Sequence, residues 1–226
     1  MALLLLAEHD NNNLNQATAR ALSAAKLIDP DVHLLVAGNE CAGVAQQGAK
    51  LDGVKQVLLA QDIALGQQLA EPMAALVVSL ASDYESIVAA ATSNGKNILP
   101  RIAALLDVMQ VSDIVAVISP DTFVRPIYAG NALQTIKATD GKKIVTIRTS
   151  AFDPAGQSND AAPVANVKLA DFPGVSLFVS EAGNDGEGVE LASASRVISG
   201  GRALGSKQAF DDLNEGTFIR KAQKSG

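Results

Sequence analysis

The sequence has one cysteine, two histidines and no surplus of basic residues, and each scarcity excludes a class of protein. Cys41 alone cannot build a disulfide framework or a multi-cysteine metal site, so we expect a small half-buried residue in a reducing cytosol. Lys and Arg number 18 against 24 Asp and Glu, which gives a net charge of −6 without a basic stripe. This balance argues against nucleic acid or anionic lipid as the main partner.

The residues of hydrolytic and metal-dependent catalysis are equally sparse. His9 and His33 lie in or just after expected strands, with no second histidine or cysteine at ligand spacing, so structural roles are favoured. No serine has the G-x-S-x-G setting and no carboxylate pair stands out. The stretch "AATSNGKNILPR" lacks the Walker spacing, so Asn94 as a helix cap is favoured over an anion site at Lys96, and Pro100 should kink or restart that helix.

The N-terminal stretch "MALLLLAEHD" contains four consecutive leucines but has neither the basic start nor the length of a signal peptide. A membrane span needs roughly 20 apolar residues. We interpret residues 3–7 as a buried parallel strand and expect a cytoplasmic chain of bacterial type without membrane insertion.

Residues 1 to about 118 alternate between apolar runs and amphipathic helical patterns. After residues 3–7, strands are expected at 32–38, 54–60, 85–92 and 112–119. The asparagines before Leu14 are suited to capping the first helix. Nearly continuous apolar strands between helices are typical of an α/β fold, a mostly parallel sheet with helices on both faces.

The pattern changes after residue 119. Residues 126–138 and 143–153 flank the turn signal "TDG" and predict an antiparallel extension. Residues 154–166 are small and polar, as in a linker. The stretch "VSLFVSE" at 175–181 predicts another strand, and "AGNDGEG" at 182–188 predicts a flexible turn. We therefore expect an N-terminal α/β domain at 1–153, a linker with a peripheral strand and turn at 154–190, and the start of a further domain with an irregular tail at 191–226.

Two segments are candidates for function. The loop "SPDTFVRPIYAGNALQT" follows the end of a buried strand, where open parallel sheets hold ligands or partners. A structural pair between Asp121 and Arg125 and a partner interface are equally compatible with it. In "RVISGGRALGS" the glycines do not have the G-x-G-x-x-G spacing, so by spacing alone a glycine turn with a solvated Arg202 is at least as compatible as a cofactor loop.

Taken together, these segments resemble the α subunit of electron transfer flavoproteins over roughly residues 1 to 206. The stretches "LLLLAEHDNNNL", "ATSNGKNILPRIAALLDV", "SPDTFVRPIYAGNA" and "RVISGGRALGS" recur in family order. The resemblance implies a nucleotide α-hydrolase-like sheet and an αβ heterodimer with an electron transfer flavoprotein β subunit that holds AMP. It also implies an FAD that takes electrons from acyl-CoA and related flavin dehydrogenases of fatty acid β-oxidation and amino-acid catabolism, and passes them to a quinone oxidoreductase.

The resemblance also assigns the cofactor-binding residues. In the family, FAD is bound mainly by a C-terminal domain that begins at the segment matching "VISGGR", and the arginine of that motif contacts the flavin. The matching residues here are Gly200, Gly201 and Arg202. A guanidinium at that position favours the reduced, anionic forms of the flavin by Coulomb attraction.

The amino-acid sequence departs from the family pattern after about Ser206, so the FAD-binding domain is expected to be truncated. Two hypotheses follow. In the first, the chain is an α subunit by descent, an electron carrier rather than a substrate-converting enzyme, which pairs with a β subunit through the N-terminal domain and holds FAD weakly or not at all. In the second, it is a non-catalytic fragment or scaffold that binds a β-type partner, or a nucleotide, without holding FAD.

Overall fold

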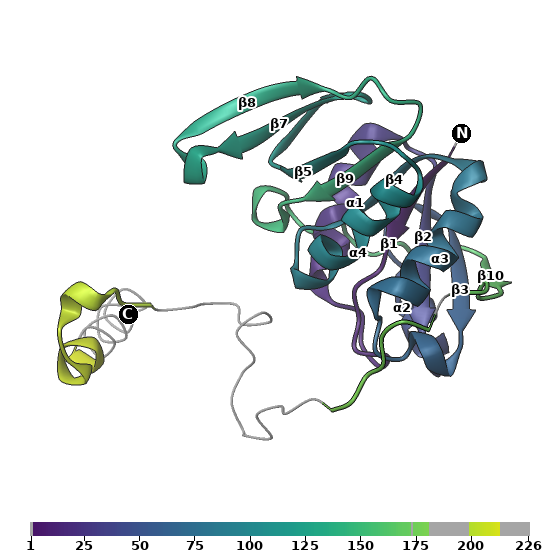
Figure 1. Ribbon diagram of the computed structural model, residues 1–226, viewed down its shortest axis with the longest axis horizontal. Coiled ribbons are helices and arrows are strands. Elements are labelled where there is room, and N and C mark those ends of the chain that lie inside the picture. The colour runs from purple at the N-terminus through teal and green to yellow at the C-terminus, as the bar shows by residue number, and fades with distance from the viewer. Residues whose placement is uncertain (1, 173, 181–198, 213–226) are drawn as a thin grey trace. The chain divides into compact units, whose positions relative to one another are not determined.

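The computed structural model describes residues 2–172, 174–180 and 199–212. The chain divides into two units, residues 1–181 and 182–226, and each is described by itself. The first unit holds the helices and sheets labelled in Figure 1.

A parallel sheet of seven strands forms the centre of the first unit (Figure 1). Every residue of the leucine-rich first strand is buried, because helices cover both faces of the sheet. The predicted α/β fold is therefore confirmed. In spatial order the strands are β10 (Val164–Val167), β3 (Val54–Gln61), β2 (Val32–Gly38), β1 (Ala2–Leu6), β4 (Tyr84–Ala90), β9 (Lys143–Ile147) and β5 (Gln110–Ile114).

Two helices pack on each face of the sheet. Helices α1 (Gln16–Ile28) and α2 (Ala42–Ala49) pack against one face, where Leu3 and Leu5 are buried. Helices α3 (Ala70–Leu80) and α4 (Ser93–Leu105) pack against the other, where Leu4 and Leu6 are buried. Successive leucines of β1 thus supply two separate cores, as the alternation of side chains along a strand requires.

The helix caps differ from those predicted. Helix α1 is capped by Asn15, which follows Leu14 and accepts a hydrogen bond from the backbone N–H of Ala17 at 2.9 Å. Helix α4 is capped by Thr92 and not by Asn94, and it continues through Pro100 without restarting. The exposed position of Pro100 places its ring on the solvent side of α4.

The antiparallel extension exists, but its strands are not the predicted ones. It consists of β6 (Ala116–Ser119), β7 (Thr122–Ile127) and β8 (Ala132–Lys137), so β8 pairs with β7. The expected strand at 112–119 is broken, because β5 stays in the main sheet and β6 leaves it. The expected partner at 143–153 is β9, which lies parallel between β4 and β5. Four of its five residues are buried, and a peripheral hairpin could not bury them.

The segment after β9 also corrects the sequence analysis. The predicted linker at 154–166 contains most of β10, which pairs in parallel with β3 at the edge of the main sheet. Residues 175–180, predicted as a strand, have no strand pairing and expose Val175, Leu177 and Val179. The predicted turn at 182–188 and the tail beyond residue 212 lie outside the described residues. Among the described residues, no helix has the length and apolarity needed to cross a membrane.

Candidate functional site

The crevice between β1 and β4 is the place where an open sheet of this topology holds a ligand. From β1 the chain builds outward through β2 and β3 on one side, whereas β4 lies on the other side. The two connections diverge at the carboxyl ends of these strands, which is the switch point where such sheets bind ligands. Glu8 and His9 follow β1 here, and Thr92 and Asn94 follow β4.

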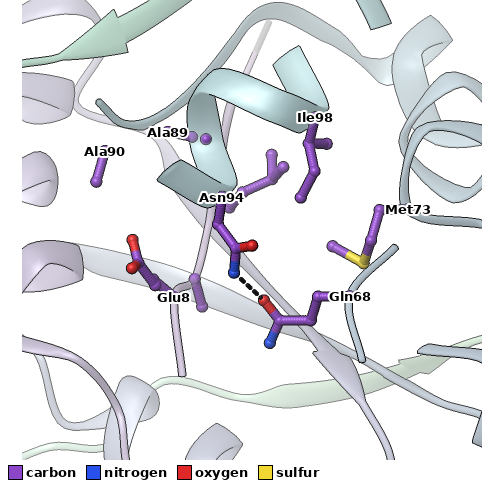
Figure 2. Close-up of a pocket in the computed structure, with 10 residues that line it drawn as sticks. Glu8, Gln68, Met73, Ala89, Ala90, Asn94 and Ile98 are labelled. Atoms are coloured by element: carbon purple, nitrogen blue, oxygen red, sulfur yellow. Dashed lines mark hydrogen bonds between the residues drawn. The ribbon is translucent and has the colours of Figure 1, made fainter. Parts of the chain in front are cut away.

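Side chains fill this crevice almost completely. Figure 2 shows Glu8, Gln68 and Asn94 converging on it, with Met73 and Ile98 forming an apolar side. The remaining cavity of about 20 Å³ has room for a single water molecule, and ligand sites have several hundred Å³. In this conformation the crevice is closed to a nucleotide.

Glu8 joins the end of β1 to the beginning of α4. Its Oε2 accepts a hydrogen bond from Thr92 Oγ1 at 2.6 Å, and Thr92 Oγ1 accepts one from the backbone N–H of Gly95 at 3.4 Å. The backbone N–H of Glu8 donates to Thr18 Oγ1 at 2.9 Å. Burial raises the pKa of Glu8, and the hydrogen bond from Thr92 opposes that rise.

His9 and Gln68 close the other side of the crevice. His9 Nδ1 accepts a hydrogen bond from the backbone N–H of Asn11 at 3.1 Å. Gln68 Nε2 donates to the backbone oxygen of His9 at 3.1 Å, and Gln68 Oε1 accepts from Asn94 Nδ2 at 2.9 Å. Burial lowers the pKa of His9, which favours the neutral imidazole. His33 lies elsewhere, with Nδ1 2.9 Å from the Tyr84 hydroxyl.

The loop singled out after residue 119 is part of the three-stranded sheet. Asp121 accepts hydrogen bonds from Ser119 and Thr122, both at 2.8 Å, and forms an ion pair with Lys137 at 3.2 Å. These contacts lower the pKa of Asp121 to about 2. Arg125 donates instead to Gln134 Oε1 at 3.2 Å, so the predicted Asp121–Arg125 pair is wrong. Asp121 directly precedes β7 and Arg125 lies within it, and each contacts a different residue of β8.

The β7–β8 connection presents a strained and apolar tip. Tyr128, Ala129 and Gly130 have successive φ angles of 49°, 54° and 92°, a conformation that only glycine adopts without cost. Tyr128 is 80% exposed and Leu133 is 67% exposed. Strain in residues other than glycine concentrates at binding sites, and exposed apolar side chains mark contact surfaces, so this tip is a candidate interface.

The segment with the predicted cofactor residues lies in the second unit. Gly200, Gly201 and Arg202 are exposed, and Arg202 begins a short 3₁₀ helix, Arg202–Leu204, which is capped by Gly205 with φ 73°. A Cβ on Gly200 would come within 2.1 Å of the Leu204 side chain, whereas one on Gly201 would meet nothing within 4 Å. Gly200 thus lies close to the Leu204 side chain, and Gly201 borders open space.

Sequence reasoning missed the residues that fill the switch point. Glu8 follows a correctly located strand, so its carboxyl-edge position was a usable signal, whereas Thr92 was expected to be the last residue of the strand at 85–92 and in fact lies beyond β4. The sequence gives no signal for Gln68, because this residue lies in the loop after β3 and reaches the crevice only through the tertiary fold.

Comparison with known proteins identifies the family. The electron transfer flavoprotein domain model matches residues 3–172. The electron transfer flavoprotein subunit alpha of Paracoccus denitrificans is 50% identical over 216 residues, which are 95% of this chain and 70% of that protein. The corresponding subunit of Bradyrhizobium diazoefficiens is 53% identical over 93% of this chain and 67% of that protein, and the one from Pseudomonas aeruginosa 46% over 94% and 69%. The chain therefore belongs to the electron transfer flavoprotein α-subunit family.

Proposed function

We propose that this chain acts as the α subunit of an electron carrier. It accepts electrons from acyl-CoA and related flavin dehydrogenases of fatty acid β-oxidation and amino-acid catabolism, and passes them through FAD to a quinone oxidoreductase. The single observation that supports this most is 50% identity to an α subunit over 95% of the chain. The cytoplasmic location expected from the sequence belongs to the same proposal.

The β subunit binds, in this proposal, at the three-stranded sheet of β6, β7 and β8. Ile118, Tyr128 and Leu133 expose 61%, 80% and 67% of their surface there. An apolar surface of this kind is stabilised when a partner covers it. The left-handed backbone at Tyr128 and Ala129 lies at the tip of the same sheet, and strained backbone of this kind concentrates at binding sites.

The residues at 200–202 fit one edge of a flavin. FAD, when bound, supplies a ring that takes up and releases electrons. The Arg202 guanidinium stabilises negative charge on such a ring and offers planar hydrogen-bond donors. Gly201, with open space where a Cβ would be, allows its backbone to approach a ligand, and Gly200 keeps the turn packed against Leu204.

The second candidate function is a scaffold that binds a β-type partner without holding FAD. Within the described segment 199–212, all three residues at 200–202 are exposed, which favours it, since a flavin site needs enclosing walls. Its nucleotide version is disfavoured by the filled switch point.

One co-purification experiment separates these functions. The chain is tagged and co-expressed with a β subunit from the same genome, and the visible spectrum of the purified material is recorded. A β subunit with stoichiometric flavin supports the electron carrier. A β subunit without flavin supports the scaffold, and absence of the β subunit contradicts both.

Arg202 is tested in the flavin-bound pair. Arg202→Ala removes the positive charge, so we expect a lower flavin reduction potential, because the negative charge of the reduced ring loses its stabilisation. Lys207→Ala removes a neighbouring exposed cation and serves as the control. Equal potentials in the two variants would contradict a contact between Arg202 and the flavin.

A further inference from the structure

The side chain of Gln68 is held at the switch point in the way that a ligand would be held. Its Oε1 accepts from Asn94 Nδ2 at 2.9 Å, the contact drawn in Figure 2, and its Nε2 donates to the His9 backbone oxygen at 3.1 Å. His9 follows β1 and Asn94 follows β4, whereas Gln68 belongs to the loop after β3. A third element therefore places one planar amide between the two strands that flank the switch point.

The cradle around this amide is selective. Gln68 is only 7% exposed, so both ends of its amide depend on hydrogen bonds to protein groups. Little water is present that could replace those hydrogen bonds if they were lost. A primary carboxamide offers a donor and an acceptor in one plane and matches both groups. A carboxylate would place an acceptor against the His9 carbonyl oxygen, close to Glu8, and a single hydroxyl could not span both ends.

The backbone at Gln68 shows that tertiary contacts hold the residue in place. Its φ is 48°, in the left-handed region that residues other than glycine rarely adopt. The loop is tied down by Asn11 Nδ2, which donates to the Gly66 oxygen at 2.8 Å, and by the buried Leu65. Strain of this kind persists only where the surroundings determine the conformation, and the amide contacts are part of that determination.

We propose that the switch point is a binding site for a planar primary carboxamide, and that Gln68 is its resident intramolecular ligand. The cavity that Gln68, Asn94 and Glu8 line is small because the site is already occupied by the chain itself. The proposal concerns the first unit alone and does not depend on electron transfer.

Chemical rescue of a variant tests the proposal on the full chain. Gln68→Gly vacates the cradle and also relieves the left-handed strain, because glycine adopts that conformation freely. Acetamide is the probe and acetate is the comparison compound. At ten times its dissociation constant a ligand raises the folded-to-unfolded ratio about 11-fold, which is about 3–6 °C in Tm for a chain of this size. We expect acetamide to give that rise in Gln68→Gly relative to the wild-type chain, and acetate to give none.

Gln47→Ala is the matched control. The Gln47 amide is also held at both ends, accepting from the Leu14 N–H and donating to the Asn12 oxygen, each at 2.9 Å, but it lies on the exposed surface. Water replaces those contacts, so acetamide should shift its Tm no more than that of the wild-type chain. An equal response of Gln68→Gly, Gln47→Ala and the wild-type chain overturns the proposal.

A second variant keeps the test decisive if Gln68→Gly does not fold. Gln68→Ala also removes the amide and vacates the cradle, but it does not give the unfolded chain the added freedom that glycine brings, so acetamide should raise its Tm in the same selective way. Nuclear magnetic resonance then locates the probe: in folded Gln68→Gly the Asn94 side-chain amide signals should shift saturably with acetamide. Rescue without that shift, or no rescue of Gln68→Ala when Gln68→Gly is unfolded, also overturns the proposal.

Discussion

At the scale of single residues, the switch point is stabilised by polar groups whose protonation the fold alters. Glu8 and His9 are neighbours, yet burial raises the pKa of the first and lowers the pKa of the second. In both cases burial favours the neutral form. The crevice is therefore a place where charge is unfavourable and hydrogen bonds between neutral groups are preferred.

Glu8→Gln should change how stability depends on pH. Because the pKa of Glu8 is raised above its ordinary 4.5 in the folded chain, the folded state binds the proton more tightly, and stability falls as pH rises from 4.5 through the raised pKa. Glutamine keeps an acceptor for Thr92 and cannot ionise. Urea unfolding between pH 4.5 and 7.5 should show the variant gaining stability relative to the wild-type chain as pH rises.

His9 titrates in an overlapping range but is present in both proteins, so the difference between the two curves isolates Glu8. Its lowered pKa makes stability rise with pH from that value up to its ordinary 6.5. A difference that does not vary with pH would contradict the assignment to Glu8.

At the scale of elements, local patterns locate helices and strands, and neighbouring elements decide their ends and partners. Helix α4 is an example, because Pro100 signalled a break and the helix continues to Leu105. The buried Ile98, Leu99 and Ile102 anchor it to the sheet on both sides of the proline. The free energy gained by packing these side chains against the sheet therefore exceeds the helix-breaking tendency of Pro100.

Pro100→Ala should stabilise the chain. Alanine restores a backbone N–H in a helix interior where proline costs about 3 kcal/mol, and greater freedom of the unfolded chain offsets part of the gain. We expect a net gain of about 1–2 kcal/mol in the free energy of unfolding, measured by urea denaturation. A loss of stability would show that the proline ring supports the helix in a way that its exposed position does not indicate.

At the scale of the whole molecule, the first unit combines a parallel sheet covered on both faces with a small antiparallel one that buries Phe123 in the core and exposes other apolar side chains. The main sheet has its polar crevice filled by the chain's own side chains, whereas β6, β7 and β8 expose apolar ones. In the first unit, the small sheet is therefore the surface at which we propose that a protein partner binds.

Leu133→Lys should weaken retention of the β subunit in co-purification without lowering the stability of the isolated chain. Leu133 is 67% exposed, so the charge costs little until a partner would bury it. Ile63→Lys is the control, since Ile63 is 85% exposed but lies in the loop after β3. Equal retention of the β subunit by both variants would argue against the proposed interface.

The sequence by itself determined the class of fold, the first four parallel strands and the family. These depend on local signals, namely apolar runs such as residues 3–7, helical spacing and the text of specific segments. The tertiary structure decided the rest. It placed β9 inside the main sheet and not beside β8, because its buried side chains need cover on both faces. It also brought Gln68 to Asn94 and His9, because strand order is set by contacts between residues far apart in the chain, which no local pattern records.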